Sequence, residues 1–184
     1  ILETPVETDL SSLEFREEEI GTPAAIIRGI AAYFDRLGYR TGGFFACIDS
    51  KIAVGSGLSS SASFELLVAE VFNRLYNKNS LSALELARAG RWAENTYFGK
   101  PCGLMDQIAC AHGGIVAVDF AGPVKTAPRH TNDFAGLPKP GPSKPEPPHI
   151  EGLRFSFENY GYRLCLLETG SSHTDLTADY AAIP

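Results

Sequence analysis

Four stretches of the chain place apolar residues at the spacing of an amphipathic helix. Residues 22–37 do so behind Thr22 in the N-cap position and Pro23 at the first helical position, and Gly38 supplies the stop. The same periodicity predicts three further helices: from about Ser59 to Tyr76, from Ser82 to Tyr97, and from near Met105 to Gly113.

Two of these helices carry additional signals. Ser82 and Glu85 have the spacing of a capping box, and Gly99 with Pro101 should end that helix. The helix that begins near Ser59 is expected to be apolar at Phe64, Leu67, Val68, Val71, Phe72 and Leu75.

Shorter apolar runs predict strands. Gly43–Asp49 and Ile115–Phe120 are strand candidates. Leu153–Phe157 and Tyr162–Leu167 resemble a hairpin that turns at Glu158–Gly161, and a last helix should begin near Asp175. Because strands and helices interleave irregularly, the pattern favours an α+β fold over a regular βαβ alternation.

The stretch 121–149 differs from the rest of the chain. It holds eight of the 12 prolines and almost no large apolar residues, which favours a loop insertion. The predicted organisation is therefore a domain over 1–120, the insertion over 121–149, and the start of a second half over 150–184. The chain begins at Ile1 without Met and is expected to be an internal piece of a longer protein.

Composition narrows the class of protein. The 184 residues carry a net charge of −6 and are 44% hydrophobic, which is typical of a globular chain and unfavourable for a nucleic-acid binder. No apolar run approaches the roughly 20 residues of a membrane span. The four cysteines have no zinc-ligand spacing and are expected to be reduced, buried thiols of a cytoplasmic protein.

A run of glycines and serines precedes the helix expected from Ser59. Its glycines let the backbone turn closely around a ligand, and unpaired amides at the start of the helix favour an anion such as a polyphosphate. The run lacks the ending of a Walker A loop, and an ordinary serine cap is the alternative. The candidate phosphate-binding residues are Gly55, Ser56, Gly57, Leu58, Ser59, Ser60 and Ser61.

Two carboxylates follow, twelve residues apart. Asp106 should lie in the first turn of a short helix, where the helix dipole favours its ionised form, as a base or anion beside a transferring phosphoryl group requires. Glu94 lies near the end of the preceding helix and could bind Mg²⁺ with a hydroxyl, since this ion often uses only one or two protein oxygens. Taken singly, each could also be an ordinary helix acid.

Together, the segments GSGLSSSA, AENTYFGKPCGLMDQ and GSSHTDLTADY resemble the GHMP small-molecule kinases, and the second and third are most similar to the galactokinase branch. The resemblance implies a two-layer α+β N-terminal domain like domain 2 of ribosomal protein S5, followed by the start of a second α+β domain.

The resemblance also implies roles for single residues. Gly55–Ser61 would surround the phosphates of ATP, and Ser61, or its neighbour Ser60, would bind Mg²⁺ with Glu94. Asp106 would contact the anomeric hydroxyl of the sugar as proton acceptor or orienting anion. Gly103 and Tyr180 would bind the sugar.

The implied activity is ATP-dependent phosphorylation of galactose to galactose 1-phosphate. The alternatives are another sugar kinase of the same family, such as an N-acetylgalactosamine kinase, or a non-catalytic sugar and ATP sensor. Nothing in residues 1–20 matches the sugar-gripping motif that opens galactokinases, so the chain by itself is expected to have little or no activity. The oligomeric state is open.

Overall fold

The computed structural model describes residues 5–52, 56–120 and 147–167. The chain divides into two compact units, one comprising Ile1–Gly113 with Phe157–Pro184 and the other Gly114–Ser156. The helix predicted near Asp175 lies outside the described residues. The sequence-based domain boundaries stay a prediction.

Helix α1 spans Pro23–Arg36 and begins as the sequence predicts. Thr22 is its N-cap and accepts a hydrogen bond from the amide of Ala25. After the helix, Gly38 has a φ of +79°, a left-handed conformation that glycine adopts without strain. A short 3-10 helix, η1, precedes α1 at Glu17–Glu19.

Helix α2 spans Ser60–Tyr76, one residue from the predicted start. Its buried face includes Leu66, Val68 and Phe72. The predicted apolar face is only partly right, because the side chains of Leu67 and Leu75 are 42% and 61% exposed.

Helix α3 spans Ala83–Ala93, and Ser82 with Glu85 forms the predicted capping box. A π-helical turn, η2, continues it over Glu94–Phe98, and Gly99 ends it with a φ of +83°. Helix α4 follows at Met105–His112, as predicted.

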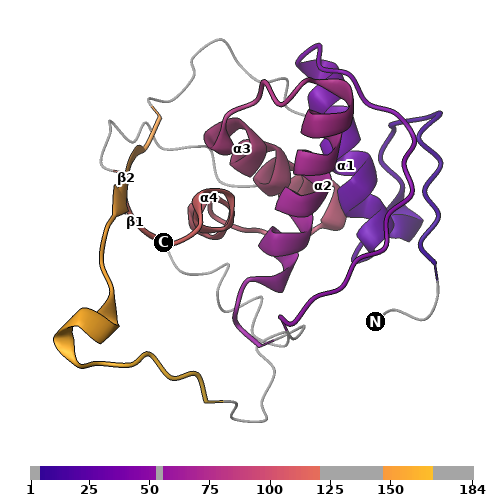
Figure 1. The fold of residues 1–184 in the computed structure, drawn as a ribbon. Helices are drawn as coiled ribbons and strands as arrows, with labels where there is room; N and C mark the ends of the chain where they lie inside the picture. The colour runs from indigo at the N-terminus through magenta and orange to yellow at the C-terminus, as the bar shows by residue number, and fades with distance from the viewer. Residues whose placement is uncertain (1–4, 53–55, 121–146, 168–184) are drawn as a thin grey trace. The chain divides into compact units, whose positions relative to one another are not determined.

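Helix α3 is central to this unit, since it packs against α1, α2 and α4 (Figure 1). Helix α2 also packs against α1 and α4. The apolar core lies where these helices meet. Its buried side chains are Ile26, Ile30, Ala31, Phe34, Leu66, Val68, Ala69, Phe72, Leu81, Leu86, Ala89 and Ala93.

The second unit contains a two-stranded antiparallel sheet. Strand β1 at Ile115–Asp119 confirms a predicted strand, and β2 spans His149–Leu153. Ile115 pairs with Leu153 at one end of the ladder and Asp119 with His149 at the other. Helices with a small sheet are compatible with the α+β class, and β2 begins at His149, the last residue of the predicted insertion.

The hairpin predicted after residue 153 is wrong. Phe157–Tyr160 forms a 3-10 helix, η3, and residues 161–167 form no strand. The turn itself is present, since the amide of Gly161 donates to the carbonyl of Glu158. The strand on its N-terminal side is shifted to His149–Leu153, where β1 supplies the hydrogen-bonding partner.

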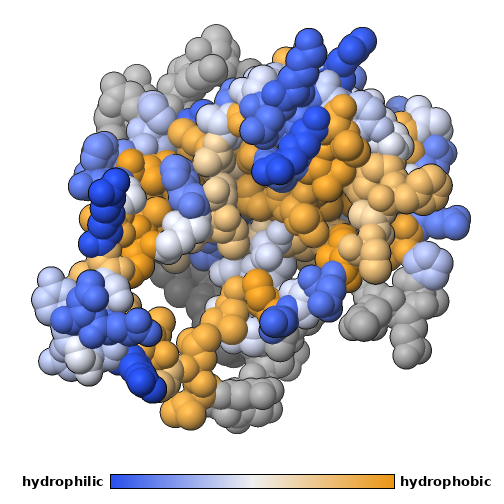
Figure 2. Space-filling view, in the orientation of Figure 1, coloured by the Kyte–Doolittle hydropathy of each residue, from blue (hydrophilic) through white to orange (hydrophobic). Residues whose placement is uncertain are grey.

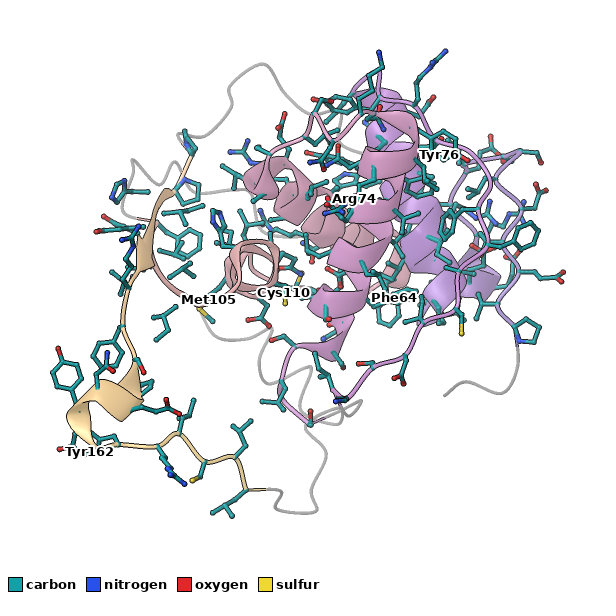
Figure 3. The ribbon with its side chains drawn as sticks, viewed as in Figure 1. Phe64, Arg74, Tyr76, Met105, Cys110 and Tyr162 are labelled. Carbon is teal, nitrogen blue, oxygen red and sulfur yellow. The ribbon has the colours of Figure 1, made fainter. Side chains whose placement is uncertain are left out.

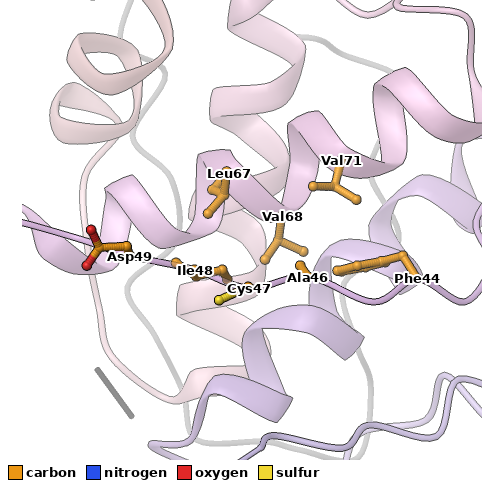
Figure 4. Close-up of a pocket in the computed structure, with 8 residues that line it drawn as sticks. All are labelled: Phe44, Ala46, Cys47, Ile48, Asp49, Leu67, Val68 and Val71. Carbon is orange, nitrogen blue, oxygen red and sulfur yellow. The ribbon is translucent and has the colours of Figure 1, made fainter.

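The strand predicted at Gly43–Asp49 is also not formed. Within the described residues this segment pairs with no other strand and instead borders α2 (Figure 4). It forms one wall of a largely apolar pocket. Figure 2 shows apolar surface gathered over this part of the molecule. The pocket is lined by Phe44, Ala46, Cys47, Ile48, Asp49, Leu67, Val68 and Val71.

The cysteines are free, but the prediction that they are buried is wrong. Cys47, Cys110 and Cys165 are exposed, and Cys102 is half-buried. The apolar neighbours of Cys47 and Cys165 in the sequence do not bury them, because neither segment forms the predicted strand.

Candidate active site

The predicted phosphate-binding run lies at the start of α2. Gly55 is outside the described residues, and Ser56, Gly57 and Leu58 are exposed. Gly57 has a φ of +75°, and Ser59 is left-handed with a φ of +58°. Ser59 is the N-cap of α2, yet its side chain makes no capping hydrogen bond. The ordinary serine cap, the alternative reading of this run, is therefore not formed, and the positive end of α2 faces an exposed loop.

Glu94 is almost completely buried at the end of α3, with a side chain 2% exposed. Its Oε1 accepts a hydrogen bond from Nζ of Lys100 at 3.2 Å. Its Oε2 accepts one from Nε2 of Gln107 at 3.1 Å. The carboxylate that the sequence marks as a magnesium ligand thus already interacts with a cation and an amide.

Glu65 was not among the residues that the sequence singled out. It lies in α2, one helical turn after Ser61, and is fully buried. Its Oε2 accepts a hydrogen bond from Nε2 of Gln107 at 3.0 Å, so one amide group holds two carboxyl groups. An acidic residue one turn from Ser61, on the apolar side of a helix, was the sequence signal that could have found it.

This buried cluster changes the protonation of its members. Burial, and then the charge of Glu94, raise the pKa of Glu65 to about 8, so Glu65 is mostly neutral at pH 7. Burial also raises the pKa of the Cys102 thiol, with Glu94 adding to the effect. In addition, Oε1 of Glu65 and Oε1 of Gln107 are buried without a hydrogen-bond partner.

The segment between Glu94 and α4 is fixed by its own hydrogen bonds. The amide of Cys102 donates to Oδ1 of Asn95 at 2.7 Å, and Nδ2 of Asn95 donates to the carbonyl of Cys102 at 3.2 Å. Gly103 follows and is exposed, with open space where a Cβ would lie. Backbone at Gly103 is therefore accessible, as a sugar-binding role would require.

Asp106 lies in the first turn of α4 and is exposed. Cys110 is one helical turn further on the same helix, on the side of α4 that faces α2 (Figure 3). Partial burial, and then the charges of Asp106 and Glu65, raise the pKa of the Cys110 thiol. The face of α4 that carries Asp106 is therefore within electrostatic reach of Glu65 in α2.

These contacts bring three sequence-distant elements to one junction. Glu65 in the second turn of α2 and Gln107 in the first turn of α4 are bonded to each other, and Glu94 at the end of α3 joins them. The first two turns of α2 and the first turn of α4 are thus linked to Glu94 through Gln107, and Asp106 is the residue before Gln107 in α4. Tyr180 lies outside the described residues.

Residues 25–114 match the family model of the GHMP kinases N terminal domain. The chain contains a GHMP kinase N-terminal domain. Every described residue of the junction belongs to this domain, from Ser56 to Gln107, whereas Tyr180 lies beyond it.

Curated relatives of this domain include galactokinases. The chain is 41% identical to the galactokinase of Thermococcus kodakarensis over 103 residues, which are 55% of this chain and 29% of that protein. It is 47% identical to that of Clostridium tetani over 76 residues, 41% of this chain and 19% of the relative. It is 37% identical to the galactokinase of Lactococcus lactis strain IL1403 over 111 residues, which are 60% of this chain and 27% of that protein. The chain therefore spans less than a third of each of these relatives.

Within the parts of the chain that the structure describes, no helix combines the length and apolarity that a membrane crossing needs.

Proposed function

We propose that this chain is part of a galactokinase, which transfers the γ-phosphoryl group of ATP to the anomeric hydroxyl of galactose. The observation that carries the proposal is the link of the first turns of α2 and α4 to Glu94 through Gln107. The similarity to three galactokinases supports the choice of substrate. We further propose that the domain has the two-layer, S5-like fold, that the protein is cytoplasmic, and that the chain is part of a longer kinase.

In this proposal, the loop and first turn of α2 bind the phosphates of ATP through main-chain amides and serine hydroxyls. The helix dipole of α2 stabilises the negative charge that develops on the transferring group. Asp106 orients the sugar hydroxyl or accepts its proton, and its exposure leaves it accessible to a substrate. Gly103 and Tyr180 are proposed to bind the sugar.

Glu94 and Ser61, or Ser60, are proposed to hold Mg²⁺. The donors fit this ion, since it prefers carboxylate and hydroxyl oxygens and few protein ligands. The carboxylate of Glu94 already forms an ion pair with the ammonium group of Lys100, which indicates a position that favours positive charge. Bound Mg²⁺ would neutralise phosphate charge during transfer.

The test is a thermal-shift series on the 184-residue chain. We expect MgCl₂ with a non-hydrolysable ATP analogue to raise the Tm of this chain. In the longer kinase, which would supply the sugar-gripping motif, we expect galactose to raise the Tm further than N-acetylgalactosamine or glucose. A ligand present at about 100 times its Kd stabilises a protein by about 2.7 kcal/mol. A larger response to N-acetylgalactosamine would favour the alternative sugar kinase, and no response to the nucleotide would contradict the proposal.

Asp106 provides the matched variant. Asp106→Asn keeps the size of the side chain and removes its charge, so the nucleotide response should persist while phosphoryl transfer by the longer kinase is lost. If Asp106→Asn also loses the nucleotide response, Asp106 has a structural role. A longer wild-type protein that binds both ligands but transfers no phosphate would be a sensor.

A further inference from the structure

Lys100 places a positive charge directly on the buried carboxylate of Glu94. Its Nζ lies 3.2 Å from Oε1 of Glu94, and its main-chain amide donates to the carbonyl of Glu94 at 3.1 Å. Two bonds thus connect the same pair of residues across the turn that ends at Gly99, where φ is +83°. The turn thus brings Lys100 back beside Glu94, so that its ammonium group lies within reach of Oε1.

The two oxygens of Glu94 have different surroundings. Oε2 is held from the protein interior by Gln107, which is itself bonded to the buried Glu65. Oε1 is bonded to Lys100, whose side chain is 37% exposed while that of Glu94 is 2% exposed. Lys100 therefore lies on the solvent side of the carboxylate and shields Oε1 from solvent.

We propose that Lys100 is a resident cation that neutralises Glu94 in the metal-free protein and that a divalent cation must displace it from Oε1. This inference rests on the proposed function, in which Glu94 is a magnesium ligand. Lys100 and Mg²⁺ then compete for the same oxygen, because two cations at one carboxylate oxygen repel each other. The lysine lowers the apparent affinity for the metal while keeping the buried carboxylate paired when the metal is absent.

The first test measures binding of Mn²⁺ alone to the 184-residue chain, from the electron paramagnetic resonance signal of the free ion. Lys100→Met removes the competing charge and should lower the Kd for Mn²⁺ by up to about fivefold, the upper end of the range expected for a partly exposed ion pair. Lys100→Arg keeps the charge and should bind like wild type. Lys78→Met removes an exposed charge from the turn after α2 and serves as the matched control. Circular dichroism checks that each variant is folded.

The second test follows the amine of Lys100 itself. Acylation of lysines, read by mass spectrometry of peptides, should increase at Lys100 when Mn²⁺ is added and stay constant at Lys78. In Glu94→Gln the partner charge is gone, so Lys100 should react rapidly with or without the metal.

The outcomes separate this inference from the proposed function. A Glu94→Gln chain that binds Mn²⁺ as wild type does, or a wild-type chain that binds none, overturns the metal role of Glu94 and with it the competition. If Glu94→Gln loses the metal but Lys100→Met binds no more tightly than wild type, only the role of Lys100 is overturned. If acylation of Lys100 does not change when the metal binds, the role of Lys100 is likewise overturned.

Discussion

The helical unit contains two buried charged clusters that differ in how completely they are satisfied. Around Arg28 in α1, Nε and Nη2 donate to the carboxylate of Glu19 at 2.8 and 2.6 Å. Its Nη1 donates to the carbonyls of Asp9 and Ser12. The hydrogen bond and charge of Arg28 lower the pKa of Glu19, so both partners are ionised at neutral pH. This cluster ties the segment before α1 to the helix.

The cluster at Glu94 is built differently. Two carboxyl groups, Glu65 and Glu94, share the amide of Gln107, and Glu94 forms an ion pair with Lys100. Oε1 of Glu65 and Oε1 of Gln107 have no partner. Buried polar groups that are incompletely satisfied cost stability, and such sites tend to be functional. The difference separates a cluster that stabilises the fold from one that is suited to a ligand.

The largest effect on stability is expected from removing Arg28, the centre of the cluster whose hydrogen bonds are complete. Arg28→Met keeps the length of the side chain but removes the nearer cationic partner of Glu19, whose side chain is 15% exposed. Breaking such a pair should lower the free energy of unfolding by about 3–5 kcal/mol, measured by urea denaturation. Arg16, whose Nη1 lies 3.8 Å from Glu19, is the control, and Arg16→Met should change the stability by less than about 1 kcal/mol. Equal effects of both variants would contradict the comparison.

The second prediction concerns pH and Glu65. Because its pKa in the folded chain is about 8, above the ordinary value of 4.5, the folded state binds the extra proton between these values. Its contribution to stability is therefore fully present below pH 4.5 and is lost as the pH rises through 8. Glu65→Gln cannot titrate, so relative to wild type it should gain on the order of a few kcal/mol between pH 5 and 9. Urea midpoints at several pH values, in buffer with EDTA, measure this, and a pH-independent difference would show that Glu65 is not protonated.

A smaller loss of stability is expected when a methyl group is added at two glycines where helices pack closely. A Cβ at Gly29 would lie 2.9 Å from Cβ and 3.0 Å from Cα of Ala93, which cannot easily move, so Gly29→Ala should destabilise by about 1–3 kcal/mol. A Cβ at Gly90 would be less crowded, at 3.0 Å from Oε2 and 3.1 Å from Cβ of Glu65. Gly90→Ala should therefore cost less, and should alter the pH dependence assigned to Glu65. Thermal unfolding at two pH values distinguishes the variants, and the opposite order would contradict this packing.

The helices could be predicted from the sequence because their signals are local. The caps at Thr22 and Ser82 and the stop at Gly38 depend on residues within one turn, and all three are present in the structure. The prediction of a strand at Gly43–Asp49 was wrong because a strand needs a hydrogen-bonded partner elsewhere in the chain, and periodicity does not reveal one. The hairpin after Leu153 failed for the same reason.

The roles of Glu94 and Asp106 were proposed from their spacing and the family resemblance, and they stay predictions. The structure shows that Glu94 is connected to α4, the helix of Asp106, through Gln107. Glu65 and Lys100 were not found, because their importance arises from contacts across helices and across the turn after η2. The one local signal for Glu65 was an acidic residue one turn after Ser61 on the apolar side of α2, and no local pattern distinguishes Lys100 from an ordinary surface charge.

The most direct test of the central claim, that the junction at Glu94 is a metal–nucleotide site, is the thermal response of wild type and Glu94→Gln to MgCl₂ with a non-hydrolysable ATP analogue. Gln keeps the shape of the side chain and can still accept a hydrogen bond from Gln107. We expect the wild-type chain to be stabilised by the nucleotide more with MgCl₂ than with EDTA, and Glu94→Gln to lose this difference while remaining folded. A magnesium-dependent stabilisation of the same size in both proteins would contradict the account.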